Sequence, residues 1–166
     1  MKPLLVPPPL DAARALYDLE AIRDRLPQRH EMELLDRIVY LDPEERVIAG
    51  VVEVREDAFW VRGHFPARPI LPGVLIIEAA GQLCSFYHRE VQRERLGPAR
   101  PGDPEGVLAF ASAERVKFRD VVCPGDDLLL VAHIQSLTPR RARFRAEGIV
   151  GDRLVFEAEL TGMVLR

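Results

Sequence analysis

Three chemically useful features follow one another near the middle of the chain: His64, the pair Pro72-Gly73, and Glu78. An imidazole with an ordinary pKa near 6.5 can take up a proton at neutral pH. Pro-Gly is a typical helix start, and the first N–H groups of that helix, on Gly73 and Val74, have no intrahelical partner and can stabilise a developing oxyanion. Glu78 lies one turn further on, where a carboxyl among apolar residues can hold a proton. These parts suit general acid–base chemistry on a substrate that develops negative charge on oxygen.

The stretch that follows the Pro-Gly pair predicts a buried helix. Glu78 is its only charge between Val74 and Tyr87, and Gln82 and Ser85 are its other polar side chains. In a helix these three fall within about 60° of one another, on one stripe. A helix that is apolar on its other sides must be buried, so the stripe must face groups that satisfy it. We expect Gln82 either to orient Glu78 or a water molecule, or to be satisfied by a neighbouring strand.

The segments on either side read as a short helix and many strands. Apolar spacing favours a helix over 10–26, or a shorter one over 19–26 capped by Asp18. Pro124-Gly125 and Gly151-Asp152 are tight-turn signals, and short turns imply antiparallel pairing. We therefore predict an α+β fold in which an antiparallel sheet wraps one long buried helix. Strands are expected at 34–40, 47–54, 107–112, 115–119, 128–136, 141–150 and 154–164.

Length and composition narrow the class of protein. The 166 residues suit one domain, expected at 10–166, after a flexible arm at 1–9 that is rich in proline. A net charge of −3 argues against nucleic-acid binding, and no apolar run is long enough to span a membrane. The start has no signal-peptide pattern, and two cysteines are too few for a disulfide framework, so we expect a cytoplasmic protein. No metal-ligand cluster, phosphate loop or dinucleotide motif is present, so we expect no metal and no cofactor.

The segment GHFPARPILPGVLIIEAAGQ at 63–82 resembles the signature of the bacterial 3-hydroxyacyl-[acyl-carrier-protein] dehydratases of fatty-acid synthesis. The resemblance extends to LPQR at 26–29, LLDRI at 34–38 and RVKFRDVVCPGD at 115–126. It implies the hotdog fold, and dehydration of 3-hydroxyacyl thioesters to trans-2-enoyl thioesters. The implied catalytic residues are His64 and Glu78, with Gly73 and Val74 as the oxyanion site.

The same resemblance implies partners. The family acts on acyl chains held by acyl carrier protein, and it forms homodimers, in some cases trimers of dimers, in which His64 of one subunit would face Glu78 of the other. Gln28, Glu31 and Glu33 stand where the family has histidine, proline and an apolar residue. These polar substitutions leave the acyl-chain preference open.

Other interpretations remain at this point. A hotdog thioesterase needs a carboxylate and a helix start but not His64, and a non-catalytic acyl-thioester-binding protein needs neither acid nor base.

Arg141 and Arg143 alternate with Ala142 and so share the outward face of a strand. They form either a solvated charged face or a docking surface for the acidic carrier protein.

Overall fold

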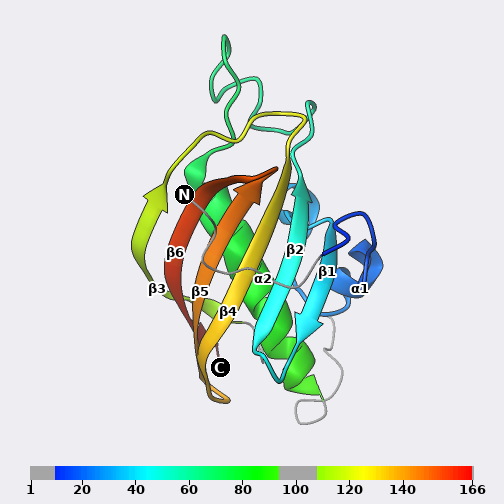
Figure 1. The fold of residues 1–166 in the computed structure, drawn as a ribbon, viewed down its shortest axis with the longest axis vertical. Coiled ribbons are helices and arrows are strands. Elements are labelled where there is room, and N and C mark those ends of the chain that lie inside the picture. The colour runs from blue at the N-terminus through cyan, green and yellow to red at the C-terminus, as the bar shows by residue number, and fades with distance from the viewer. Residues whose placement is uncertain (1–9, 94–107, 166) are drawn as a thin grey trace.

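One long helix and a six-stranded sheet make up most of the computed structural model, which describes residues 10–93 and 108–165 (Figure 1). The arm predicted at 1–9 lies outside the described residues. The helices are α1 (Leu19–Arg23), a 3₁₀ turn (His30–Met32) and α2 (Gly73–Val91). The strands are β1 (Arg37–Asp42), β2 (Val47–Glu53), β3 (Leu108–Phe118), β4 (Asp127–Leu137), β5 (Arg141–Val150) and β6 (Arg153–Val164).

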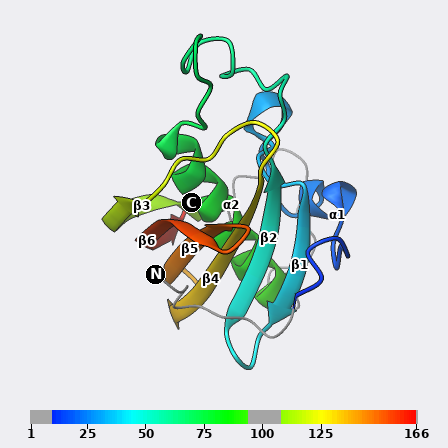
Figure 2. The same cartoon turned by 45° about the horizontal axis from the view of Figure 1, so that its top comes forward.

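The sheet has the order β1-β2-β4-β5-β6-β3, and every neighbouring pair is antiparallel. The helix α2 crosses one face diagonally, from the β3 side to the β1 side (Figures 1 and 2). This arrangement confirms the α+β fold with a central helix that the sequence predicts. The strands β1 and β3 are the two edges of the sheet.

The apolar sides of α2 explain why the helix lies where it does. Leu83 and Phe86 are fully buried and belong to the same core as Ile48, Leu130 and Phe144 of the sheet. Each such side chain stabilises the fold by roughly 1.5–3 kcal/mol when it leaves water. The helix predicted over 74–87 is correct and extends to Val91.

The first helix is the shorter of the two predicted alternatives: it begins at Leu19, and the Asp18 carboxylate accepts a hydrogen bond from the Ala21 N–H at 2.9 Å. Its predicted end at 26 was wrong, since the helix ends at Arg23, and the strand expected at 34–40 lies at Arg37–Asp42. The strands expected at 107–112 and 115–119 form one strand, β3, within the described residues. Its register with β6 shifts twice, and Arg115 has a φ of 51°, so irregular positions absorb the polar break without ending the pairing.

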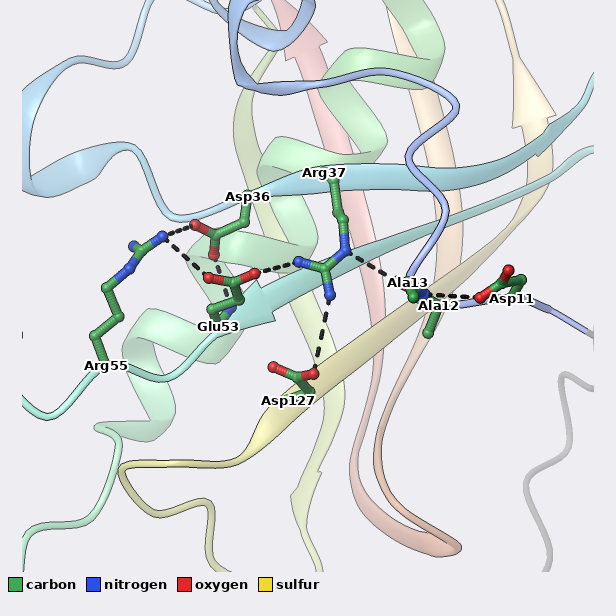
Figure 3. A network of polar contacts seen from close by, with 8 residues as sticks. All are labelled: Asp11, Ala12, Ala13, Asp36, Arg37, Glu53, Arg55 and Asp127. Atoms are coloured by element: carbon green, nitrogen blue, oxygen red, sulfur yellow. Dashed lines mark hydrogen bonds and ion pairs between the residues drawn. The ribbon is translucent and has the colours of Figure 1, made fainter.

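A polar network fixes the point where β2 leaves the sheet (Figure 3). Asp36 accepts a hydrogen bond from the Glu53 N–H at 2.7 Å and also pairs with Arg55. The Arg37 guanidinium pairs with the Glu53 carboxylate and lies 3.9 Å from the carboxylate of Asp127 at the start of β4. The loop at 54–72 therefore departs from a braced strand end.

His88 is a buried ionisable group in the last turns of α2. The residue is fully buried, and neither ring nitrogen has a well-formed hydrogen bond among the described residues. Burial lowers the pKa of His88, the Arg89 charge adds to this, and the nearby backbone of Thr138 opposes it. The folded protein therefore holds this imidazole neutral.

This burial predicts a loss of stability in mild acid. In the unfolded chain His88 takes up a proton below its ordinary pKa near 6.5, whereas in the folded chain it does so only at lower pH, so acid favours unfolding. The free energy of unfolding, measured with urea at pH 7.5, 6.5 and 5.5, should fall in the wild type between pH 6.5 and 5.5. In His88→Leu this fall should be smaller, by up to about 1.4 kcal/mol per pH unit. An unchanged pH slope in this variant would contradict the assignment.

Candidate active site

The loop that carries His64 is anchored at its two ends, whereas its tip at 65–68 is exposed, so the packing that its apolar composition suggests is limited to the ends. Trp60 and Leu71 are buried at either end of it. The His64 N–H donates to the Trp60 carbonyl at 2.8 Å, and the Ile70 N–H donates to the His64 carbonyl at 2.8 Å. The Leu71 N–H donates to the Val122 carbonyl at 2.8 Å, which ties the loop to the segment before β4. The backbone of His64 is therefore fixed on both sides.

The His64 ring has one nitrogen committed and one available. Its Nδ1 lies 2.7 Å from the Ile70 carbonyl oxygen. A carbonyl can only accept, so Nδ1 carries the hydrogen, and in the neutral ring the lone pair is on Nε2. Phe65 stacks on the imidazole with ring centroids 4.2 Å apart. The side chain is thus held as a base whose free atom is Nε2.

The start of α2 is the second part of the site. Pro72 is the N-cap, and its carbonyl accepts from the N–H groups of Leu75 at 2.9 Å and Ile76 at 3.4 Å. The N–H groups of Gly73 and Val74 precede these first helical bonds. A Cβ at Gly73 would lie 2.6 Å from the Phe118 ring, so a side chain at this position would have to displace the ring. Val74 is 70% exposed, so the helix start has an open side.

Gln82 holds Glu78 in place. Its Nε2 donates to Glu78 Oε1 at 2.9 Å and to the Met32 carbonyl at 2.9 Å, and its Oε1 accepts from the Leu34 N–H at 3.3 Å. Gln82 therefore contacts Glu78 as one of the two expectations requires, whereas its other partners come from the segment before β1 and not from the neighbouring strand of the alternative. Ser85, the third residue of the stripe, donates to the Leu108 carbonyl at 3.3 Å.

His64 and Glu78 are fixed separately. In the described part of the chain, no hydrogen bond or ion pair joins His64 to Glu78. His64 is anchored to its own loop, and Glu78 is anchored through Gln82 to Met32 and Leu34. The arrangement provides a proton acceptor, a helix start for an oxyanion, and a carboxyl, each held by the backbone of a different segment.

The predicted docking arginines lie at the other end of the sheet. Arg141 is exposed at the start of β5, next to the β4–β5 turn, whereas the helix start lies near Val122, beyond the opposite end of β4 (Figure 1). Arg143 pairs with Glu159 at 2.7 Å, and this hydrogen bond lowers the pKa of Glu159. Their role in docking stays a prediction.

Glu31 and Glu33, which differ from the family pattern, line a cavity of about 400 Å³. Glu31, Glu33 and Asp57 contribute to its wall together with Trp60, and Glu78 is not among its lining residues. Glu33 pairs with Arg23 at 2.7 Å. The side-chain oxygen of Gln28 is buried without a hydrogen-bond partner among the described residues.

Sequence reasoning missed two aromatic residues beside the helix. Phe110 and Phe118 of β3 place their rings where side chains on Gly81 and Gly73 would otherwise be. The sequence carries no local signal for these contacts: eight residues separate both the two glycines and the two phenylalanines, but they span about 12 Å along a helix and about 26 Å along a strand.

Comparison of the sequence with known proteins identifies the family of this chain. Residues 26–159 match the FabA-like domain. The chain belongs to the FabA-like dehydratase family. The 3-hydroxyacyl-[acyl-carrier-protein] dehydratase FabZ of Alkalilimnicola ehrlichii is 34% identical over 146 residues, which cover 88% of this chain and 90% of the relative. The FabZ of an Anaeromyxobacter species is 36% identical over 155 residues, covering 92% and 93%.

Solved structures confirm the hotdog fold. The dehydratase heterocomplex ApeI:P from Xenorhabdus doucetiae matches with a TM-score of 0.71 at 15% identity, covering 87% of this chain and 91% of that one. The E. coli PaaI protein of the phenylacetic acid degradation operon matches with a TM-score of 0.54 at 14% identity, covering 76% and 80%. Among the described residues, no helix has the length and apolarity to cross a membrane.

The bonds of Gln82 predict a stability effect. Gln82→Leu removes the partner of the Met32 carbonyl and of the Leu34 N–H, which are partly buried, at roughly 0.5–1.5 kcal/mol for each lost hydrogen bond. Urea unfolding should show that the free energy of unfolding falls by about 1–3 kcal/mol. The same change at exposed Gln135 on β4 is the control and should stay within about 0.5 kcal/mol of the wild type. Equal effects at both positions would contradict the role of Gln82.

Proposed function

We propose that this protein dehydrates 3-hydroxyacyl-[acyl-carrier-protein] to trans-2-enoyl-[acyl-carrier-protein] in fatty-acid biosynthesis. The observation that carries the proposal is the Nδ1 contact of His64 with the Ile70 carbonyl, which leaves Nε2 as a base on a rigid loop. The held carboxyl of Glu78 and the names of the two FabZ relatives support it. A binding protein would need neither fixed group.

The chemistry follows from the parts. His64 Nε2 removes a proton from C2 of the substrate, and the electron pair moves toward the thioester carbonyl. The N–H groups of Gly73 and Val74 stabilise the charge that develops on that oxygen. The C3–O bond then breaks as Glu78 gives its proton to the departing hydroxyl, which leaves as water, and the C2=C3 double bond forms. His64 then releases its extra proton to solvent, and Glu78 takes up a proton from solvent, which restores the enzyme.

Removing the base or the acid should reduce turnover without unfolding the protein. His64→Ala and Glu78→Ala should each lower kcat by roughly 10²- to 10⁴-fold, the usual size of a lost general acid or base. The assay follows enoyl absorbance and free thiol together, with circular dichroism as the folding control. Release of thiol without enoyl product would identify a thioesterase, and near-wild-type turnover in either variant would refute the mechanism.

We further propose that the active site is shared between two subunits of a homodimer. Three apolar side chains lie exposed along the start of α2 and the edge strand β3: Val74, Phe110 and Phe118 are 70%, 45% and 51% exposed. Apolar groups gathered at an unpaired sheet edge favour pairing with a second copy. A two-fold interface there would create two equivalent sites. His64 of one subunit would face Glu78 of its partner, since each is anchored to its own segment.

Mixed dimers test the shared site. A dimer of one His64→Ala chain and one Glu78→Ala chain would contain one intact site and one that lacks both groups. Co-expression with two different tags, followed by purification through both tags, should yield a substantial fraction of wild-type activity. Doubly tagged dimers as inactive as the two parents would show that both residues act within one chain.

Arg141 and Arg143 complete the proposal as docking residues for the acidic carrier protein. Arg141 is exposed, and Arg143 is partly exposed while sharing its charge with Glu159. A shared site allows residues far from the helix start of one subunit to serve the site of the other. The cytoplasmic location expected from the sequence likewise stays a prediction.

A further inference from the structure

The loop that carries His64 begins where two residues of the segment before β4 face one residue at the end of β2. The Val54 N–H donates to the Asp126 carbonyl at 3.0 Å, and the Gly125 N–H donates to the Val54 carbonyl at 2.7 Å. Two residues opposite one is the pairing of a β-bulge, and Gly125 has the positive φ, 92°, that this pairing often requires. The backbone of Gly125 and Asp126 therefore defines the point from which the loop departs.

The same segment holds the other end of the loop. The Leu71 N–H donates to the Val122 carbonyl at 2.8 Å, and Leu71 directly precedes Pro72, the N-cap of α2. Val54 and Leu71 lie at opposite ends of the loop, whereas their partners all lie within residues 122–126. The segment between β3 and β4 runs along the end of the sheet from which the loop leaves (Figures 1 and 2). One short stretch of chain therefore fixes where the loop begins, where it ends and where the helix starts.

The Asp126 carboxylate closes the turn within this stretch. Its Oδ2 accepts a hydrogen bond from the Cys123 N–H at 2.8 Å, and the Asp126 N–H donates to the Cys123 carbonyl at 3.1 Å. Pro124 and Gly125 occupy the two central positions, as in a type II turn. Without the carboxylate the Cys123 N–H loses this partner, and the backbone of Gly125 and Asp126 is held opposite Val54 less firmly.

We propose that Asp126 is a positioning residue for the loop at 54–72. The inference rests on the proposed function, because the group that it positions is the base, His64. The carboxylate bonds to the Cys123 N–H, so it acts on His64 through the shape of the turn and the backbone bonds that the turn makes. Proton removal from C2 needs His64 Nε2 within reach of that proton, and a displacement of about 1 Å caused far from the chemistry can lower the rate about 100-fold.

Steady-state kinetics and tryptophan fluorescence test this role together, with 3-hydroxybutyryl- and 3-hydroxyoctanoyl-[acyl-carrier-protein] as substrates. Asp126→Ala should lower kcat by about 10- to 100-fold with a smaller change in KM. Asp126→Asn should keep most of the wild-type kcat, because the amide oxygen can accept the same hydrogen bond. Trp60 is the only tryptophan in the chain and lies buried in the loop. Asp126→Ala should therefore also shift the Trp60 emission to longer wavelength and increase its quenching by acrylamide.

Asp42 provides the matched control for the carboxylate. It closes the β1–β2 turn, at the other end of β2, by accepting hydrogen bonds from the N–H groups of Glu44 and Glu45 at 2.8 and 3.0 Å. Asp42→Ala should lower the urea midpoint, as Asp126→Ala does. Because its turn is remote from the loop, it should leave kcat and the tryptophan emission unchanged.

A pair of glycines tests the turn with the carboxylate intact. Gly125 and Gly151 have φ values of 92° and 60°, and a Cβ at either position meets no atom within 4 Å. Alanine at either glycine therefore strains the backbone without a steric clash. Gly125→Ala should lower kcat and shift the Trp60 emission, whereas Gly151→Ala, in the β5–β6 turn, should do neither.

The outcomes separate the two proposals. A wild type that produces no enoyl thioester from either substrate refutes the proposed function, whereas the emission of Trp60 reports the position of the loop independently of activity. If kcat and emission in Asp126→Ala equal those in Asp42→Ala, the positioning role alone is wrong. Asp126→Asn as inactive as Asp126→Ala would also overturn it, because the hydrogen bond would then not be what matters. If Asp126→Ala proves unfolded by circular dichroism, Gly125→Ala decides: an unchanged kcat in this folded variant refutes positioning by the turn.

Discussion

The amide of Gln82 resolves the main conflict in this structure, which is that a helix buried on most sides also carries a carboxyl. Burying a polar group without a partner is costly, and a segment as apolar as α2 supplies few partners of its own. Both hydrogens of the amide are used, one on Glu78 and one on the Met32 carbonyl, and its oxygen accepts from Leu34. The helix, the carboxyl and the segment before β1 therefore have one common orientation. The placement of the Glu78 carboxyl depends on one bond of this amide, and the other two join α2 to the segment before β1.

His64 is positioned by a different means, through the backbone of a loop. Prolines at 66, 69 and 72 restrict the chain, while buried Trp60 and Leu71 anchor its two ends. The carbonyl of Ile70 then selects the protonated nitrogen of His64. The polar network around Asp36 and Glu53 holds the strand end from which this loop departs (Figure 3). Two groups on separate supports can be brought to opposite sides of a substrate more readily than two groups on one helix face.

Periodicity revealed the helix, and turn residues revealed the strands, because both depend on neighbours in sequence. The helix capped by Asp18 was one of two predicted alternatives, because apolar spacing alone does not distinguish a helix that begins at residue 10 from one that begins at residue 19. The single strand β3 was predicted as two, at 107–112 and 115–119, because an irregular strand position has no local marker in the sequence. The contacts of Phe110 and Phe118 with glycines were not foreseen, since they join residues almost 30 and 45 positions apart. The stripe on α2 showed that Gln82 needed a partner, but not that Met32 and Leu34 would provide it.

The two aromatic–glycine contacts along α2 have a consequence for how this chain can diverge. Each contact divides a fixed volume between a helix position and a strand position: Gly73 with Phe118, and Gly81 with Phe110. A larger residue on the helix requires the facing ring to move or to become smaller, so the members of each pair are expected to covary among homologues. Libraries that enlarge the glycine alone will displace the ring, which is half exposed. Joint randomisation samples combinations that conserve volume, which protein interiors tolerate best.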